Sequence, residues 1–304
     1  MTEYQYIIYN HKVSSTFEIP MAKPVKFNDE PQVKITMNEV PKIVHEEIVK
    51  GKVDYLTNEL MWFYVPGLAI YYMEGGNRIT VEVLSEEFTS LDLCSYLTGS
   101  AFTLLLIQRG YIPIHGGMIM QNGQVAIISG RSGAGKSTTV MELLNRGFRF
   151  MSDDVSAIMV KDETIIAVPA FPQQKLCRDI IEKYQIDEAT LVYIDEERDK
   201  FARKIEEQQY EQQPKALNCM IEIVPYQGDR VVIKQVQGVE KLQMLTSNLY
   251  RGLVYEKMGV SYERMDKFIR IASGIEMYQI LRPQNIDSID GVVESIQDKI
   301  FQMC

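Results

Sequence analysis

The 304-residue chain lacks the features that mark several protein classes. It has four cysteines, none in C-x-x-C spacing, which argues against a zinc site and a disulfide framework and for reduced thiols. No apolar run approaches the roughly 18 residues of a membrane span, and the polar N-terminus lacks the pattern of a signal peptide. Basic residues number 32 against 41 acidic ones, and the net charge of −9 argues against binding nucleic acid or an anionic membrane. We therefore expect a cytoplasmic protein.

The composition is otherwise that of an ordinary globular protein, with 46% hydrophobic and 24% charged residues. The chain shows no internal repeat, low-complexity tract or clear linker. We therefore expect a single interlocked domain over 1–304. Within it we distinguish a β-rich N-terminal portion plus a helix (1–110), a catalytic core (111–236) and a mostly helical C-terminal portion (237–304).

One stretch carries the most specific signal, because it matches G-x-x-x-x-G-K-[ST], the phosphate-binding P-loop. A buried strand (124–129) is expected before it and a helix (137–146) after it, so the helix N-terminus faces the anion. Lys136 is placed to reach the β- and γ-phosphates, and the Ser137 hydroxyl to ligate Mg²⁺. The alternative is a glycine-rich strand–helix turn without a ligand. The nucleotide-binding residues expected are Gly130, Arg131, Ser132, Gly133, Ala134, Gly135, Lys136, Ser137 and Thr138.

Two carboxylates follow the P-loop helix. A short apolar strand runs into Asp153 and Asp154, and strand, helix and strand with a short return predict a right-handed parallel unit. Both strands of such a unit end on one edge of the sheet, so we expect Asp153 and Asp154 beside the P-loop. Phosphoryl transfer needs carboxylates there, to ligate Mg²⁺ and to accept the proton of the acceptor hydroxyl. The alternative is a surface turn that caps the next element.

A histidine is expected close to the loop as well. Asn122-Gly123 lies between two apolar runs and predicts a two-residue hairpin turn with Gln121 opposite Gln124. That register sets His115 opposite Gly130, although a bulge at Gly116-Gly117 would shift it by one residue. The alternative is a sheet histidine held by hydrogen bonds.

Other segments follow from periodicity and turn residues. The aromatic cluster of the N-terminal portion, which includes Trp62 and Tyr71, is either core packing or a stacking platform, and core packing is favoured. We expect strands at 4–9, 33–37, 62–72, 78–84, 156–160, 164–168 and 275–281, a strand pair at 217–224 and 230–236, and helices at 90–109, from about 180, and at 239–255, 261–273 and 286–301.

Four cations are candidates for contacts with substrate. Two prolines in 169–172 exclude a central strand, so Lys175 and Arg178 are expected on a fixed loop. Lys200 and Arg203 come from the charged segment 193–206 and are weaker candidates. Solvated surface charge is the alternative for all four.

The ordered set of His115-Gly116, the P-loop, Arg146-Gly147-Phe148 and Ser152-Asp153-Asp154 resembles the HPr kinase/phosphorylase family. The resemblance implies an α/β fold with a P-loop kinase core of the phosphoenolpyruvate-carboxykinase-like type, which uses ATP and Mg²⁺. It also implies Asp153 as general base, Asp154 and Ser137 near the metal, Lys136 on the phosphates, and His115 orienting the carboxylate or phosphate. Arg131 stands where that family has an acidic residue.

The flanking segments resemble the branch of these kinases found in lasso-peptide biosynthesis. The resemblance rests on Val65-Pro66-Gly67-Leu68-Ala69 and on the loop Pro169 to Leu176. It implies phosphorylation of the C-terminal serine of a precursor peptide. A kinase of a small hydroxyl metabolite, a kinase of an HPr-like carrier protein and a non-catalytic nucleotide-binding regulator stay open as alternatives, as does a homo-oligomer.

Overall fold

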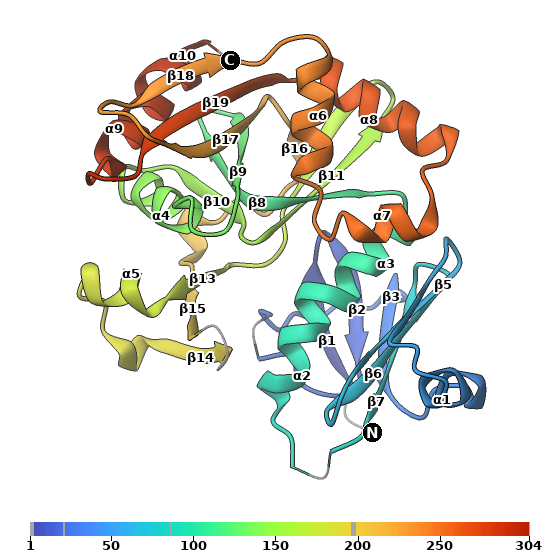
Figure 1. Ribbon diagram of the computed structural model, residues 1–304. Coiled ribbons are helices and arrows are strands. Elements are labelled where there is room, and N and C mark those ends of the chain that lie inside the picture. The colour runs from blue at the N-terminus through green and yellow to red at the C-terminus, as the bar shows by residue number, and fades with distance from the viewer. Residues whose placement is uncertain (1–2, 21, 86, 196–198, 304) are drawn as a thin grey trace.

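A computed structural model describes residues 3–20, 22–85, 87–195 and 199–303 and contains three β-sheets flanked by helices (Figure 1). The N-terminal sheet has seven strands in the order β1-β2-β3-β7-β6-β5-β4. Its strands are β1 (Tyr4–Ile8), β2 (His11–Ser15), β3 (Val33–Met37), β4 (Asp54–Leu56), β5 (Leu60–Val65), β6 (Ala69–Glu74) and β7 (Arg78–Val83), with helix α1 (Lys42–Val49) beside them. The aromatic cluster is core packing: Trp62 and Tyr71 are buried, and Phe63 stacks on Tyr71.

The nine-stranded sheet forms the centre of the molecule, in the order β16-β12-β11-β8-β9-β17-β19-β18 with β10 paired to β8. Strands β9, β17 and β19 are mutually parallel, so their carboxyl ends share one edge. The strands are β8 (Ile112–Gln121), β9 (Gln124–Gly130), β10 (Arg149–Ser152), β11 (Val155–Lys161), β12 (Thr164–Val168), β16 (Lys215–Ala216), β17 (Cys219–Tyr226), β18 (Val232–Gln235) and β19 (Glu276–Pro283). The expected mixed α/β character is confirmed.

Helices flank this central sheet (Figure 1). Helix α4 (Lys136–Asn145) packs on it through Val140, Leu143 and Leu144, each of which contributes on the order of 1.5–3 kcal/mol by burial. The others are α6 (Val239–Ser247), α7 (Leu253–Met258), α8 (Tyr262–Gly274), α9 (Ile289–Glu294), the π-helical turn η4 (Ser295–Ile300) and α10 (Phe301–Met303). The expected helix over 239–255 is therefore interrupted, because residues 248–252 form a turn.

The third sheet is small, with the order β13-β15-β14. It comprises β13 (Gln173–Cys177), β14 (Leu191–Asp195) and β15 (Lys200–Lys204), with helix α5 (Arg178–Lys183) and single turns at Glu188–Thr190 and Glu207–Gln209. The expected loop around Lys175 is therefore a strand, and the expected charged surface segment contributes the buried residues Phe201 and Ala202. The prolines precede β13, which is an edge strand, so the exclusion of a central strand is confirmed.

A continuous helix joins the N-terminal and central sheets. It consists of α2 (Ser90–Tyr96), a π-helical turn η1 (Leu97–Ala101) and α3 (Phe102–Gln108). By length and composition it could cross a membrane, but 72% of its most apolar stretch is buried. Its buried side chains belong to a hydrophobic cluster that includes Tyr6 of β1 and Met118 of β8. Such burial is typical of a core helix.

The structure corrects three expectations about strand pairing. The hairpin register is confirmed from Gln121↔Gln124 to Gly116↔Ser129, but His115 pairs with Val155 of β11 and not with Gly130. At Gly116 the strand β8 leaves β9, and the Gly116 amide donates to the carbonyl oxygen of Asp154. The expected pair at 217–236 is wrong, because β19 lies between β17 and β18. Similarly, β9 and β10 run parallel but have the antiparallel β8 between them.

The close approach of β8 and β9 at Gly116 gives a test of this packing. A Cβ atom at Gly116 would lie 2.3 Å from the carbonyl oxygen of Ile128, so Gly116→Ala must push the strands apart. We expect it to lower the free energy of unfolding by about 2–3 kcal/mol, measured by chemical denaturation. The control is Gly252→Ala, where the nearest atom would lie at 3.8 Å and the backbone is helical. Equal stability of the two variants would contradict the register.

Candidate functional site

The glycine-rich loop connects β9 to α4 and requires glycine at both of its ends. Gly130 has φ +136°, and a Cβ atom there would lie 2.5 Å from the carbonyl oxygen of Ile223. Gly135 has φ +98°, and a Cβ atom there would lie 2.2 Å from Nη1 of Arg282. Both positions need a conformation and a clearance that only glycine supplies. The backbone conformation of the loop thus explains why the motif has glycine at these two positions.

The loop turns donors toward the space above the α4 N-terminus. Within the described residues, the backbone amides of Gly133, Gly135, Lys136 and Ser137 donate to no oxygen of the fold. The Lys136 amine donates to the carbonyl oxygens of Gly130 (2.8 Å) and Arg131 (3.1 Å), so it lies over the loop. Unpaired amides at a helix N-terminus, with a lysine beside them, form an arrangement that binds phosphate.

Asp153 and Asp154 form the turn between β10 and β11, close to this loop. Lys175 of β13 holds both of them: its backbone amide donates to Oδ2 of Asp153 at 2.7 Å, and its Nζ lies 3.3 Å from Oδ2 of Asp154. Asp154 has φ +63°, a left-handed conformation that Asp tolerates better than most residues. The neighbouring Gln174 donates to the carbonyl oxygen of Ser137, which ties β13 to the first turn of α4.

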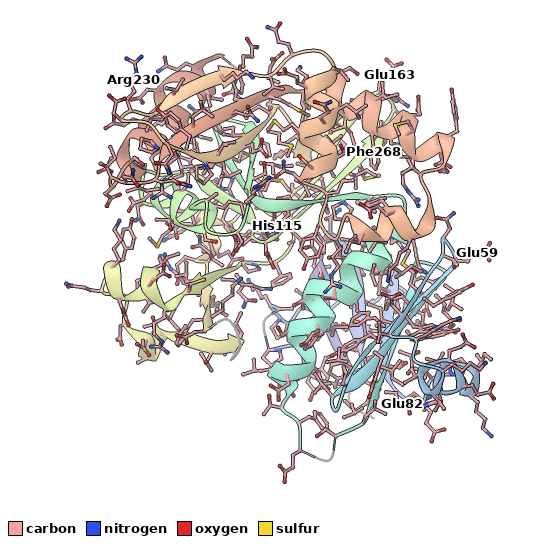
Figure 2. The ribbon with its side chains drawn as sticks, viewed as in Figure 1. Glu59, Glu82, His115, Glu163, Arg230 and Phe268 are labelled. Carbon is pink, nitrogen blue, oxygen red and sulfur yellow. The ribbon has the colours of Figure 1, made fainter. Side chains whose placement is uncertain are left out.

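His115 lies near the middle of the molecule (Figure 2) and contacts the carboxylate pair. Its Nδ1 lies 3.2 Å from the carbonyl oxygen of Asp154 and 3.5 Å from Oδ1 of the same residue. Its ring centroid lies 5.9 Å from that of Tyr250. Burial and the charge of Lys136 lower the pKa of His115, although Asp154 opposes them. His115 is therefore a neutral imidazole at physiological pH.

The two carboxylates have different pKa values, for identifiable reasons. Burial, and then the neighbouring Asp154, raise the pKa of Asp153 to about 6. Burial acts in the same direction on Asp154, but Lys175, His115 and Lys200 outweigh it and lower the pKa of Asp154 below its ordinary value. Asp154 therefore stays ionised, whereas Asp153 titrates near pH 6. In enzymes, two carboxyl groups with such different pKa values commonly take different roles in acid–base catalysis.

A pocket of about 410 Å³ opens beside the carboxylates. It lies between the η1 turn, the turn after β5, the small sheet and the 248–252 turn. Gly99 of η1 allows the Lys175 amine and the Tyr250 hydroxyl to approach within about 4 Å of where a side chain would start. Helical π-turns occur often at functional sites. Its lining includes Gly67, Gly99, Ser100, Asp154, Lys175, Lys200, Tyr250 and Arg251.

The structure separates the four cations. Lys175 and Lys200 lie on one face of the small sheet, since their cross-strand partners alternate with period two, and both line the pocket. Arg203 is paired with Gln174 on the other face. Arg178 does not line the pocket; its guanidinium forms ion pairs with Asp199 and Glu188 and lies over the Phe201 ring. Arg178 is thus occupied in holding the small sheet to α5.

Three residues at the site escaped the sequence prediction. Arg282, at the end of β19, donates from Nη1 to the carbonyl oxygen of Ala134 in the loop, at 3.0 Å. Tyr250 and Arg251 lie on the turn that interrupts 239–255. A signal existed for Arg282, because an arginine at the end of a parallel strand reaches the edge where ligands bind. The sequence of the 248–252 turn has no pattern that would mark Tyr250 or Arg251 as site residues.

A magnesium ion is compatible with these residues. Among the described residues, no three His, Cys, Asp or Glu side chains gather as a metal site. Mg²⁺ is commonly held by one or two carboxylates together with substrate phosphates and water, so an all-protein cage is not required. Asp154, whose pKa lies below its ordinary value, is a carboxylate of the kind that such an ion uses.

The fold and the site thus define an α/β protein in which a glycine-rich loop of the phosphate-binding type lies close to a pair of carboxylates. The chain matches no protein-family model. It is 32% identical over 94 residues to the HPr kinase/phosphorylase of Geobacillus sp. (strain WCH70), which covers 31% of this chain and 29% of the relative. It is 43% identical over 56 residues to the HPr kinase/phosphorylase of Lachnoclostridium phytofermentans, 18% of each. The chain is therefore homologous to HPr kinase/phosphorylase at modest identity, over less than a third of those relatives' length.

Among solved structures, the Hpr(Ser) kinase/phosphatase from Coxiella burnetii is similar to this chain. The match covers 63% of this chain and 97% of that one at 12% identity. Its TM-score of 0.33 is too low to bear on the fold.

Because the pKa of Asp153 is raised in the fold, replacing its carboxyl group should stabilise the folded protein at high pH. The folded state holds a proton on Asp153 that the unfolded chain loses near pH 3.8, so stability falls as pH rises from about 3.8 to about 6. Asp153→Asn removes this loss of stability with rising pH, and the side-chain oxygen of the introduced asparagine can still accept the hydrogen bond from the Lys175 amide. We expect the variant to be more stable than wild type by about 1–3 kcal/mol at pH 8, measured by chemical denaturation.

The difference should shrink toward zero below about pH 4, where Asp153 is protonated in both states. The control is Asp154→Asn, which removes the partner of Lys175 and should destabilise the protein at pH 8. A loss of stability in Asp153→Asn at pH 8 would show that the carboxylate is better stabilised in the fold than its surroundings indicate.

Proposed function

We propose that the protein is an ATP- and Mg²⁺-dependent kinase that transfers a phosphoryl group to a serine-type hydroxyl. The observation that carries this proposal is the contact of Asp153 and Asp154 with Lys175 and His115, next to a loop with unpaired amides. The partial homology to HPr kinase/phosphorylase supports it. The loop would bind the phosphates, and the carboxylates would face the reacting group.

In the proposed reaction the acceptor oxygen attacks the γ-phosphorus, and the bond from that phosphorus to the bridging oxygen of ADP breaks. The hydroxyl proton passes to Asp153, whose pKa of about 6 leaves it ionised at neutral pH yet basic enough to accept the proton. Lys136 and the loop amides neutralise charge on the phosphates. His115, neutral and held by Asp154, orients the phosphate or the acceptor.

Ser137 and Asp154 would hold the magnesium ion, which supplies further neutralisation of phosphate charge when bound. Arg282, which contacts the loop at Ala134, would keep the loop in its binding conformation.

For the acceptor, we infer the C-terminal serine of a lasso-peptide precursor, by the resemblance of Val65–Ala69 and of Pro169–Leu176 to that branch of kinases. The pocket supports this acceptor, because Lys175 and Asp154 line it beside the carboxylate pair. A cytoplasmic setting follows from the need for ATP. An HPr-like carrier protein is the second candidate, favoured by the partial homology to HPr kinase/phosphorylase.

The reaction is tested by incubating the protein with ATP, magnesium and an acceptor, and detecting phosphorylation by mass spectrometry. The acceptors are a serine-ended peptide, an HPr-like carrier and a mixture of hydroxyl metabolites. We expect phosphorylation of the peptide, with a rate that rises through about pH 6 as Asp153 loses its proton. Nucleotide binding without modification of any acceptor would favour a regulator.

Two variants assign the roles. Asp153→Asn should keep nucleotide binding and lose at least about 10²-fold in transfer rate, because the proton acceptor is gone. Lys136→Ala should weaken nucleotide binding or turnover. Full activity of Asp153→Asn would remove Asp153 from the mechanism.

A further inference from the structure

The turn 248–252 presents Arg251 to the pocket at a cost in backbone energy. Arg251 has φ +53°, a left-handed conformation that residues other than glycine, Asn and Asp adopt infrequently. Glycine would adopt this backbone conformation without strain, whereas an arginine at this position is disfavoured by the local backbone. Strain of this kind is found where a side chain has a task.

The turn itself is held firmly against the site. The carbonyl oxygen of Asn248 accepts from the His115 amide at 2.8 Å, and the Tyr250 amide donates to Pro113 at 2.9 Å. The Asn248 side chain donates to Glu222, a residue of β17, at 2.9 Å. The turn is therefore fixed to the central sheet at Asn248 and Tyr250, directly before Arg251.

The guanidinium of Arg251 is positioned but not neutralised. Its Nη2 donates to Oγ of Ser100 in the η1 turn, and the group lies 6.0 Å from the centre of the Phe63 ring. Within the described part of the chain, Arg251 forms no ion pair with a carboxylate, whereas Arg178 forms two. Lys175 is already paired with Asp154, so among the lining residues described Arg251 and Lys200 are the cations that the pocket offers to a ligand. Two further carboxylates line the pocket: Asp92 accepts from Thr89 at the start of α2, and Glu87 is exposed.

We propose that the pocket binds a carboxylate of the acceptor, with Arg251 as its main contact and Lys200 beside it. This inference rests on the proposed function, which requires a hydroxyl next to Asp153. A carboxylate close to the reacting hydroxyl would repel the incoming phosphates, and a planar guanidinium can neutralise it through two parallel hydrogen bonds. Arg251 therefore sets the specificity for acceptors that carry this charge, and the bound carboxylate fixes the orientation of the hydroxyl.

The inference is tested by direct binding, which does not depend on transfer. Isothermal titration uses three versions of one serine-ended peptide: the free acid, the C-terminal amide, and the amide with aspartate before the serine. We expect wild type to bind the free acid about 10- to 100-fold more tightly than the amide, and Arg251→Gln to lose most of this preference. Tight binding of the third peptide would assign the carboxylate to a side chain instead of the C-terminus.

Two further variants control for structure and charge. Arg251→Gly should lose the preference while keeping or raising the melting temperature, because it relieves the strained φ. Arg270→Gln removes one exposed positive charge on α8, away from the pocket, and should keep the preference.

Equal binding of acid and amide by wild type, retention of the preference in Arg251→Gln, or no binding of any peptide would overturn the inference. The outcomes also separate it from the reaction. Phosphorylation of the acid and the amide alike would support the kinase activity and contradict the carboxylate contact. Carboxylate-dependent binding without phosphorylation would support the carboxylate contact and contradict the kinase activity.

Discussion

Two adjacent carboxylates in a half-buried turn repel each other, and their coexistence depends on Lys175. The backbone amide of this residue satisfies Asp153, and its amine satisfies Asp154. Burial would lower the pKa of the Lys175 amine, but the surrounding acids outweigh burial and raise it. Lys175 thus contributes most to the charge balance of the site, and His115 and Lys200 add to it. The small sheet is anchored through it to the β10–β11 turn.

That anchoring explains why three separate parts of the chain meet at one edge. Strand β13 ties to Asp153 through Lys175 and to the first turn of α4 through Gln174. The η1 turn packs on the Lys175 amine at Gly99, which has no side chain to prevent it. These contacts border the pocket, whose lining includes Gly99, Lys175 and Asp154.

The sequence predicted the parts of the site that local rules control. The glycines of the loop follow from backbone conformation, and the β8–β9 register follows from the Asn122-Gly123 turn as far as Gly116. It missed the pairing of His115 with Val155, because that depends on a strand brought in from elsewhere. It also named Arg178, with Lys175, as a candidate for substrate contact, since the sequence gives no sign that Asp199 and Glu188 form ion pairs with Arg178. Arg251 lay inside a segment predicted as helix, where its backbone strain has no sequence signature.

The contact between Arg282 and the loop has a consequence for biosynthesis. Arg282 and Ala134 are 148 residues apart, yet the arginine lies so close to Gly135 that the loop and the end of β19 must be built around each other. At translation rates of about 5–20 residues per second, the loop waits roughly 7–30 seconds for its partner to be synthesised. During that interval the ribosome-bound chain carries a complete phosphate motif without the arginine that braces it. The loop therefore acquires its contact with Arg282 only after the last strand of the central sheet has joined.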